Sequence, residues 1–374
     1  MKNITYILLS FAISFSILFS SCGSGGLKKV KELSDSTSVI ANESDALFTL
    51  LEKSGNFINQ KKIPTMLPVG KVTAGKKNFH IIDIRKHKDY VEGHLDGAVN
   101  VSLEELFDYM KNKISASTYE KIVFVCYSNH KASYAAMMFR LLGYDNVYSV
   151  KWGMSACNKA TAEKKWMKNI SNEFASKLET KGNPKGAKGN YPTIKTGAKT
   201  AYGILEARVK ELLKKHNFKV KAKDVFADPS KYYIINYWKL ADYAKGHIPG
   251  AVQYNPKKSL TRNSELSTLP TDKPIAVYCF TGQHAAFVTA YLQVLGYDAY
   301  VIPYSANGFM HNALNSLKIG HAYDAKKHFK QLPLVKGELP SIIVEEQQAN
   351  DSEEEDNTAP IIIKKDEKEE EGGC

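Results

Sequence analysis

The sequence predicts an α/β protein with two domains of the same fold, each a parallel β-sheet covered by helices on both faces. Three observations predict this fold class. The 374 residues exceed what a single hydrophobic core usually serves. A long segment of the chain recurs at a constant offset of 153 residues. Within each copy, short apolar runs alternate with helical segments, which is typical of parallel sheets whose strands are buried on both faces.

Each copy of the repeat holds the same features in the same order. A short apolar run, which indicates a buried strand, ends in a polar residue and is followed by a Gly-His-x-x-Gly-Ala turn. A second apolar run stops at a cysteine, and the helix after it closes at a glycine, a natural C-terminal cap. In the two copies these positions are Asp83 and Asn236, 93–98 and 246–251, Cys126 and Cys279, and Gly143 and Gly296. Ligands of parallel sheets bind at the carboxyl ends of strands, so the two cysteines are the candidate functional residues.

The repeat also sets the expected boundaries of the segments around the two domains. We expect a signal peptide over 1–21, a tether with an N-terminal helix over 22–64, the first domain over 65–157, a basic helical linker over 158–219, the second domain over 220–320 and an acidic disordered tail over 321–374. The end of that tail, residues 338–374, holds 13 acidic residues against three lysines, which favours a solvated, disordered segment.

The net charge of +12 is unevenly distributed along the chain. Residues 151–230 hold 18 Lys and Arg against 7 Asp and Glu, whereas the acidic tail has the opposite balance. Such a tail would repel phosphate, and no base-reading module occurs in the basic stretch. We therefore expect no nucleic-acid partner, and we interpret the basic stretch as a solvated surface.

The cysteines and histidines give no sign of a metal site. Five cysteines are too few for a disulfide scaffold in a chain of this length. Neither they nor the ten histidines provide a pair at zinc-ligand spacing. We expect no metal and no cofactor.

The first residues have the pattern of an export signal. Lys2 is followed by Ile4 to Phe19, a run that is apolar apart from small hydroxyl residues and one tyrosine. This run is short for a membrane span but suits a signal peptide. It leads to Ser21-Cys22, which resembles the signal of a bacterial lipoprotein, where the cysteine is lipidated. We expect a lipid anchor at Cys22 that holds an extracytoplasmic protein to a bacterial membrane, facing the periplasm or at the cell surface. An ordinary secretory signal with an incidental cysteine is the alternative.

Three features of the repeat point to a known family. They are the Asp-x-Arg motif at 83 and 85, the two Gly-His-x-x-Gly-Ala turns, and the loops that open at the two cysteines. The segment Cys279-Phe-Thr-Gly-Gln-His is especially similar to the sulfurtransferase loop. Over roughly residues 65–155 and 220–315, both copies resemble rhodanese domains.

The resemblance implies a sulfurtransferase that works through a cysteine persulfide. The thiolate of Cys126 or Cys279 would attack the outer sulfur of a small donor such as thiosulfate, and a thiol or cyanide-like acceptor would remove that sulfur. Backbone N–H groups in the loop and the dipole of the following helix are expected to stabilise the thiolate. Asp83 is expected to support Arg85 through a buried ion pair. The candidate loop and substrate-binding residues are Arg85, Asn129, His130, Lys131, Gly282, Gln283 and His284.

The two copies differ where an anionic donor would bind. The first copy has Arg85 and Lys131 at positions where the second has Trp238 and His284. The cations of the first copy persist at physiological pH, whereas a histidine is charged only in part. We therefore expect Cys126 to carry more thiosulfate-dependent activity than Cys279.

Three other functions compete with this interpretation. Related phosphatases use Cys-x5-Arg, and the alanines Ala132 and Ala285 at the arginine position argue against that chemistry. A binding or scaffold protein at the membrane, with rhodanese-type domains that do not turn over, is one alternative. A thiol redox protein is another, provided that Cys126 and Cys157 come within disulfide reach.

Overall fold

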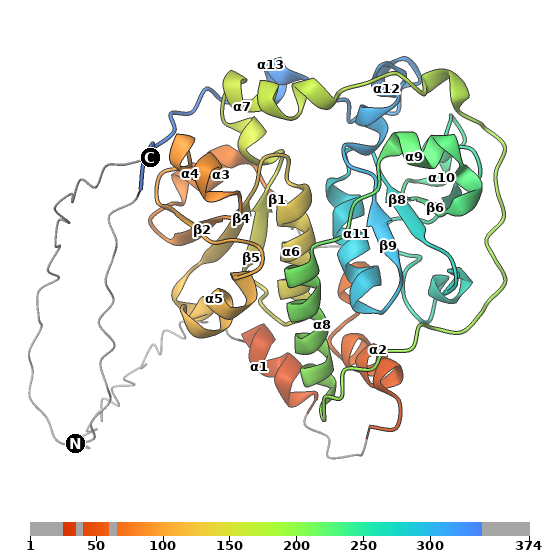
Figure 1. Ribbon diagram of the computed structural model, residues 1–374, viewed down its shortest axis with the longest axis horizontal. Helices are drawn as coiled ribbons and strands as arrows, with labels where there is room; N and C mark the ends of the chain where they lie inside the picture. Colours follow the sequence, from red (N-terminus) through yellow and green to blue (C-terminus); the bar gives the residue numbers. More distant parts are fainter. Residues whose placement is uncertain (1–24, 35–39, 60–65, 339–374) are drawn as a thin grey trace, which may run out of the picture.

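The computed structural model describes residues 25–34, 40–59 and 66–338 (Figure 1). The predicted lipidation site Cys22 and the acidic residues after Glu338 lie outside the described residues. Two lobes, each with its own parallel sheet, lie side by side, and helices of both lobes fill the space between the sheets. This arrangement confirms the predicted fold class.

The first sheet has five parallel strands in the order β1-β5-β4-β2-β3. Their bounds are Met66–Leu67 for β1, Phe79–Asp83 for β2, Ala98–Asn100 for β3, Lys121–Val125 for β4 and Val147–Val150 for β5. Residues along β4 alternate between two hydrophobic clusters, with Phe124 in one and Val123 and Val125 in the other. Both faces are therefore buried, as the apolar strand sequences predict. Strands β2 and β4 end side by side, because Asp83 pairs with Val125.

The second sheet has the order β7-β6-β8-β9. Its strands are β6 (Tyr233–Asn236), β7 (Val252–Gln253), β8 (Ile275–Tyr278) and β9 (Ala299–Val301). Residues 218–220 run beside β9, since Val220 N–H donates to Val301 O and Val301 N–H donates to Phe218 O. These residues extend the second sheet beside β9, at the edge that corresponds to the position of β1 in the first sheet.

Helices cover the outer and inner faces of both sheets. They are α1 (Gly25–Glu32), α2 (Glu43–Lys53), α3 (Val69–Ala74), α4 (His87–Glu92), α5 (Leu106–Asn112), α6 (His130–Leu141), α7 (Lys159–Lys164), α8 (Ala201–Lys215), α9 (Ala222–Ala227), α10 (Leu240–Tyr243), α11 (Gln283–Val294), α12 (His311–Ser316) and α13 (Ala325–His328). Helices α3 and α4 contribute to one hydrophobic cluster of the first sheet and α6 to the other, so they cover opposite faces. In the part of the chain that the structure describes, no helix combines the length and the apolar character needed to cross a membrane.

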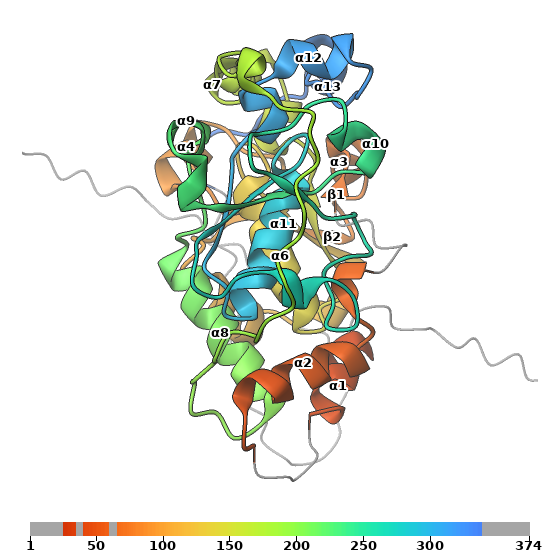
Figure 2. The same cartoon turned by 90° about the vertical axis from the view of Figure 1, so that its right-hand side faces the viewer.

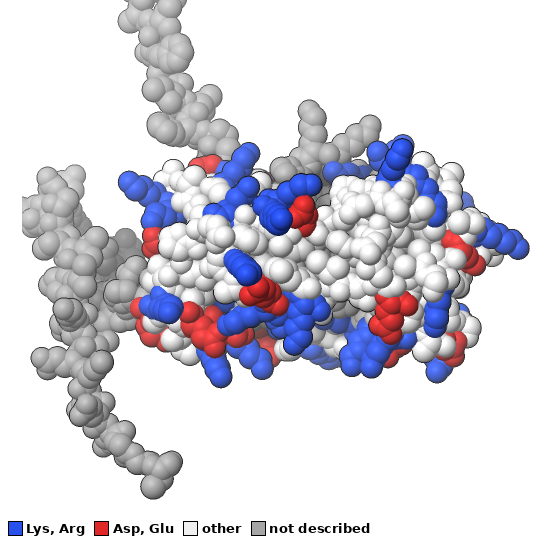
Figure 3. Space-filling view, turned by 90° about the horizontal axis from the view of Figure 1, so that it is seen from above, with Lys and Arg blue, Asp and Glu red and all other residues white. Residues whose placement is uncertain are grey.

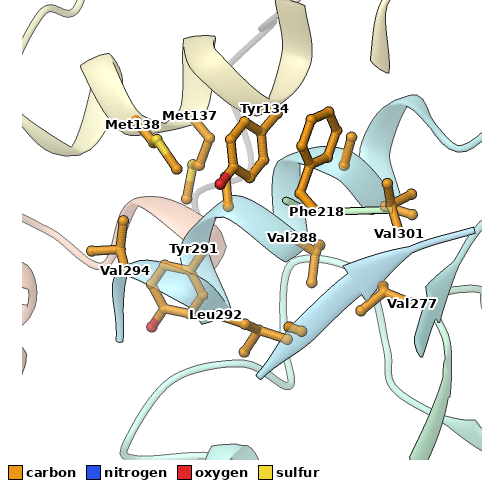
Figure 4. Packing of buried hydrophobic residues seen from close by; sticks show 14 of the residues in the cluster. Tyr134, Met137, Met138, Phe218, Val277, Val288, Tyr291, Leu292, Val294 and Val301 are labelled. Carbon is orange, nitrogen blue, oxygen red and sulfur yellow. The ribbon is translucent and has the colours of Figure 1, made fainter. Parts of the chain in front are cut away.

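Helices α6 and α11 form the main contact between the domains (Figures 1 and 2). Every residue of α6 except Lys131 is buried, and α11 is buried except at His284 and Phe287. Side chains of both helices pack into one cluster (Figure 4). Helices that are buried on all sides belong to an interior, so this pair joins the two domains into a shared core.

The segment that follows each domain crosses to the other domain. After the first domain, Glu179 exchanges backbone hydrogen bonds with His247, which lies in the Gly-His turn of the second domain. After the second domain, Val335 exchanges backbone hydrogen bonds with His94, which lies in the equivalent turn of the first domain. These reciprocal crossings connect the domains a second time, independently of the contact between α6 and α11.

Two of the predicted segments are corrected by these crossings. The prediction that a disordered tail begins at residue 321 is wrong for residues 321–338, because this stretch contacts the second domain at His321, which stacks on Phe280, and then packs on the first domain. Its Tyr323 is only 2% exposed, and Leu332 N–H donates to Cys157 O. The linker over 158–219 is helical only at α7, α8 and two short 3-10 turns, because its other residues extend across the second domain.

Candidate functional site

Cys126 is the first residue after β4, at the carboxyl end of the strand as predicted. Its Sγ accepts a hydrogen bond from Ala132 N–H at 3.4 Å, in the first turn of α6. The residue is 4% exposed and lines a cavity of about 620 Å³. The Cys126 loop packs tightly against the turn after β5, where a Cβ atom on Gly153 would lie 2.1 Å from Cys126 O. Only glycine fits at position 153. The close contact that it allows holds the Cys126 loop in place.

The predicted buried ion pair between Asp83 and Arg85 is confirmed. Arg85 Nη2 lies 2.6 Å from Asp83 Oδ2, and Nε donates to Asp83 Oδ1 at 2.9 Å. Nη2 also donates to Gly93 O at 2.7 Å, and the guanidinium lies over the Tyr127 ring at 4.8 Å. Burial alone would lower the pKa of Arg85, but Asp83 outweighs it and the pKa is raised. Arg85 therefore lines the cavity as a permanent cation whose hydrogen bonds are largely committed to the protein.

The loop residues of the two domains interlock across the interface. Asn129 has a positive φ of 68°, as the turn requires, and its Nδ2 donates to Gln283 Oε1 at 2.9 Å. Gln283 Oε1 also accepts Trp152 N–H at 2.8 Å. Asn129 is 0% exposed and Gln283 is 1% exposed. Both were predicted as loop or substrate-binding residues, and the structure gives them the loop role: they hold the two loops together. A repeat within one chain does not reveal this contact.

His130 makes the reciprocal contact from the first domain to the second. Its Nε2 lies 3.0 Å from Thr281 O and 3.3 Å from the Tyr304 backbone nitrogen. Burial, with a contribution from Lys219, lowers the pKa of His130 to about 3, so the ring is neutral. His130 lines the cavity but supplies no charge to a substrate anion there.

Cys279 is the first residue after β8 and opens the second loop. Its Sγ accepts Gly282 N–H at 3.2 Å. Burial raises the pKa of the Cys279 thiol, although hydrogen bonds from the N–H groups of Thr281, Ala285, Gly282 and His284 act in the opposite direction. Gly282 has a φ of 76°, and a Cβ atom there would lie 2.8 Å from His130 Nε2, so glycine is required. The predicted N–H cradle is thus present at Cys279.

The second domain replaces the ion pair with neutral contacts. Asn236 Nδ2 donates to Tyr278 Oη at 2.8 Å, at the place of the Asp83 carboxylate. Trp238 stacks on Phe280 with ring centroids 4.7 Å apart and an interplanar angle of 9°. Trp238 and Phe280 are the counterparts of Arg85 and Tyr127. An aromatic stack therefore occupies the place where the first domain has the Arg85 guanidinium over the Tyr127 ring. His284 is exposed and does not line the Cys126 cavity.

The cavity at Cys126 is lined by more cations than the Arg85 and Lys131 expected from the sequence. Lys131 is the one predicted lysine among them. The others come largely from the basic stretch that we interpreted as solvated surface, and they are Lys86, Lys165, Lys168, Lys219, Lys221 and Lys223. Asp89 and Glu173 are the acidic residues of the lining. The excess of lysine in residues 151–230 was the feature of the sequence that indicated a basic site. Its position beside Cys126 depends on the chain that crosses between the domains, which the sequence does not reveal.

Figure 3 shows the end of the molecule that carries α7, α12 and α13, where basic and acidic side chains both occur.

Cys157 does not behave as a redox partner for Cys126. Both thiols are free, and Cys157 is 0% exposed. Burial raises the pKa of the Cys157 thiol to about 12, and its Sγ contacts Met154 Sδ at 3.9 Å. Cys157 belongs to the opposite hydrophobic cluster from Cys126 and does not line the cavity. Burial and a raised pKa are unfavourable for a reactive thiol, so these properties do not favour the redox alternative.

The histidine of each Gly-His turn has a structural role. His94 Nδ1 lies 3.0 Å from Tyr90 O, and its ring stacks on the Tyr90 ring at 3.8 Å. His247 makes the same two contacts with Tyr243, at 2.8 Å and 3.6 Å. The turns therefore shape the loop between β2 and β3, or β6 and β7, and carry no reacting group.

Comparisons with known proteins agree with this architecture. The sequence pattern of the Rhodanese-like domain matches residues 71–160 and 222–311. The thiosulfate sulfurtransferase GlpE of Shewanella oneidensis is 35% identical over 86 residues, which are 23% of this chain and 82% of GlpE. The GlpE protein of Pseudoalteromonas translucida is 30% identical over 89 residues, which are 24% of this chain and 82% of that protein. The solved structure of the 3-mercaptopyruvate sulfotransferase SseA from Escherichia coli is 17% identical, covers 65% of this chain and 98% of SseA, and has a TM-score of 0.23. On the sequence matches, the chain belongs to the rhodanese family and carries two rhodanese-like domains in tandem.

Proposed function

We propose that this protein transfers sulfane sulfur from a small donor such as thiosulfate to a thiol or cyanide-like acceptor, through a persulfide on Cys126. The observation that carries the proposal is the placement of Cys126 at the wall of a lysine-rich cavity, with Ala132 N–H directed at its sulfur. Cys279 is the second candidate, since its loop has the same position and several N–H donors around its sulfur.

The reaction takes two steps. The Cys126 thiolate attacks the outer sulfur of thiosulfate, the S–S bond of the donor breaks, and sulfite leaves with the electron pair. The acceptor thiolate or cyanide then attacks the outer sulfur of the cysteine persulfide, which breaks the new S–S bond and regenerates the thiolate. Lysines stabilise the anionic donor and the leaving sulfite by charge, and the Ala132 N–H stabilises the charge on the Cys126 sulfur.

Persulfide formation can be measured directly by mass spectrometry. The purified protein, freshly reduced and then treated with thiosulfate, is expected to gain one sulfur atom on the peptide that contains Cys126. Cyanide should remove that sulfur and restore the original mass. The Cys157→Ser variant is the matched control, because this buried thiol takes no part in the proposed reaction and the gain should persist. Failure of the wild-type protein to gain sulfur at either Cys126 or Cys279 would refute the proposal.

We also propose that Cys22 carries a lipid anchor that holds the protein on the extracytoplasmic side of a bacterial membrane. The support is the short apolar run that ends in Ser20-Ser21-Cys22. The Cys22→Ser variant is expected to move from the membrane fraction to the soluble fraction, and the Cys374→Ser variant should stay with the membrane. If Cys22→Ser leaves the membrane association unchanged, the lipoprotein assignment is wrong.

A further inference from the structure

The cavity at Cys126 has more positive charge than a small sulfur donor can use. Eight basic residues line it and two acidic ones, within about 620 Å³. Thiosulfate is a compact dianion, and one or two charge-assisted contacts would satisfy it. The acidic side chains cannot neutralise the excess, and Asp89 already accepts a hydrogen bond from Tyr127 Oη at 3.3 Å.

The lysines of this wall are free of ion pairs within the described ranges 25–34, 40–59 and 66–338. No carboxylate there lies within ion-pair distance of Lys86, Lys131, Lys165, Lys168, Lys219, Lys221 or Lys223. Like charges gathered in one hollow repel one another and destabilise the fold. An anion with several charges would relieve that repulsion.

Lys219 is the best-placed member of the wall. The backbone around it is fixed by the hydrogen bonds between residues 218–220 and Val301 of β9. Its neighbour Phe218 stacks on Tyr134 of α6, with ring centroids 4.1 Å apart (Figure 4). Lys219 is therefore held between the two domains, on the same cavity as Cys126.

Electrostatic coupling agrees with this placement. Desolvation at the cavity wall and repulsion from Lys131 and Lys165 lower the pKa of Lys219, while attraction to the Cys126 thiolate acts in the opposite direction. Much of the Lys219 side chain is exposed, so the desolvation is that of a partly open cavity. The direction of these effects agrees with the position of Lys219 on the same cavity as Cys126.

The lysines of the cavity wall come from two parts of the chain. Lys86 and Lys131 belong to the first domain, whereas the others, Lys165 to Lys223, come from the chain between the domains and the start of the second domain. A ligand with several anionic groups matches this number of cations better than thiosulfate does.

We propose that the natural sulfur carrier at Cys126 is a polyanion: a thiol or persulfide whose body carries two or more further phosphate or carboxylate groups. This inference rests on the proposed sulfur transfer. The Cys126 thiolate attacks the terminal sulfur of the carrier persulfide, the carrier S–S bond breaks, and the carrier leaves as a thiolate while the cysteine keeps the sulfur. The lysines between the domains hold the anionic body of the carrier during this exchange.

Sodium tripolyphosphate is a suitable probe, because it has several charges and no sulfur. Calorimetric titration into the full-length Cys126→Ala protein is expected to give binding at least tenfold tighter than that of sulfate at the same ionic strength. The double variant Lys219→Gln/Lys223→Gln, made in the same background, is expected to weaken tripolyphosphate binding at least tenfold. The matched control is Lys188→Gln/Lys195→Gln, which removes the same charge from exposed lysines of the basic stretch outside the cavity lining. It should change the binding by less than twofold.

Equal loss of tripolyphosphate binding in the two double variants would overturn the inference. Tripolyphosphate binding to the parent Cys126→Ala protein that is no tighter than sulfate binding would also overturn it. Should Cys126→Ala fail to fold, the wild-type protein kept reduced gives the same titration. Binding to a protein without the nucleophile involves no sulfur chemistry. Loss of the polyanion site and loss of persulfide formation are therefore seen in separate experiments.

Discussion

The Cys126→Ala variant is expected to lose most of the thiosulfate-dependent sulfur transfer, whereas Cys279→Ala is expected to keep most of it. The reason is the charge around each sulfur. Cys126, Lys131 and Lys219 line the same cavity. Cys279 does not line this cavity. A missing charge-assisted contact to an anionic donor costs roughly 1.5–3 kcal/mol, which corresponds to about 10- to 150-fold in rate.

The surroundings of Cys279 lead to the same ranking. Trp238 stacks on Phe280, and Phe280 stacks in turn on His321 at 4.4 Å, so aromatic rings replace the cation of the first domain. Burial also raises the pKa of the Cys279 thiol, which lowers the fraction of the reactive thiolate at neutral pH. The N–H groups around Cys279 act against this rise, and the pKa remains raised in spite of them.

Initial rates of thiocyanate formation from thiosulfate and cyanide, measured for both variants at about pH 7.5, test this ranking. The remaining activity of Cys279→Ala should fall as salt is added, because the donor is bound by charge. If Cys279→Ala abolishes turnover and Cys126→Ala leaves it intact, the shape of the N–H cradle governs the reaction and the electrostatic ranking is wrong.

The sequence was sufficient for features that depend on one domain alone. The repeat places Cys126 and Cys279 after equivalent strands, and parallel pairing brings Asp83 to the end of β4 beside the Cys126 loop. The Asp83–Arg85 pair follows from the same register, since the side chains two residues apart at a strand end can meet. Local periodicity and strand order determine these positions, and both are encoded within about 90 residues.

The sequence was insufficient for features that depend on how the domains meet. His130 and Gln283 are equivalent in the repeat, and each reaches into the loop of the other domain. A repeat offset reveals which residues correspond and does not reveal which surfaces of the two copies pack together. The same limit explains Lys219, which becomes part of the Cys126 cavity only because residues 218–220 add to the edge of β9.

The Asp83→Asn variant is expected to lose roughly 3–5 kcal/mol of stability, the usual cost of breaking a buried ion pair by removing one partner. Asp83 is 0% exposed and Arg85 is 6% exposed. The variant leaves the guanidinium buried beside a neutral amide, and arginine cannot lose its charge to relieve this. The loss should appear as a lower midpoint of unfolding in urea at an unchanged slope.

The second domain supplies the control for this experiment, because it has already exchanged the pair for Asn236 and Trp238. The double variant Asp83→Asn/Arg85→Trp copies that solution, and Tyr127 is available to stack on the new indole as Phe280 stacks on Trp238. We expect it to unfold at a higher urea concentration than Asp83→Asn alone, because it removes the uncompensated charge. The two substitutions are in contact and should therefore be strongly non-additive. Additive losses in the double variant would mean that packing at this strand end, and not the buried charge, sets the cost.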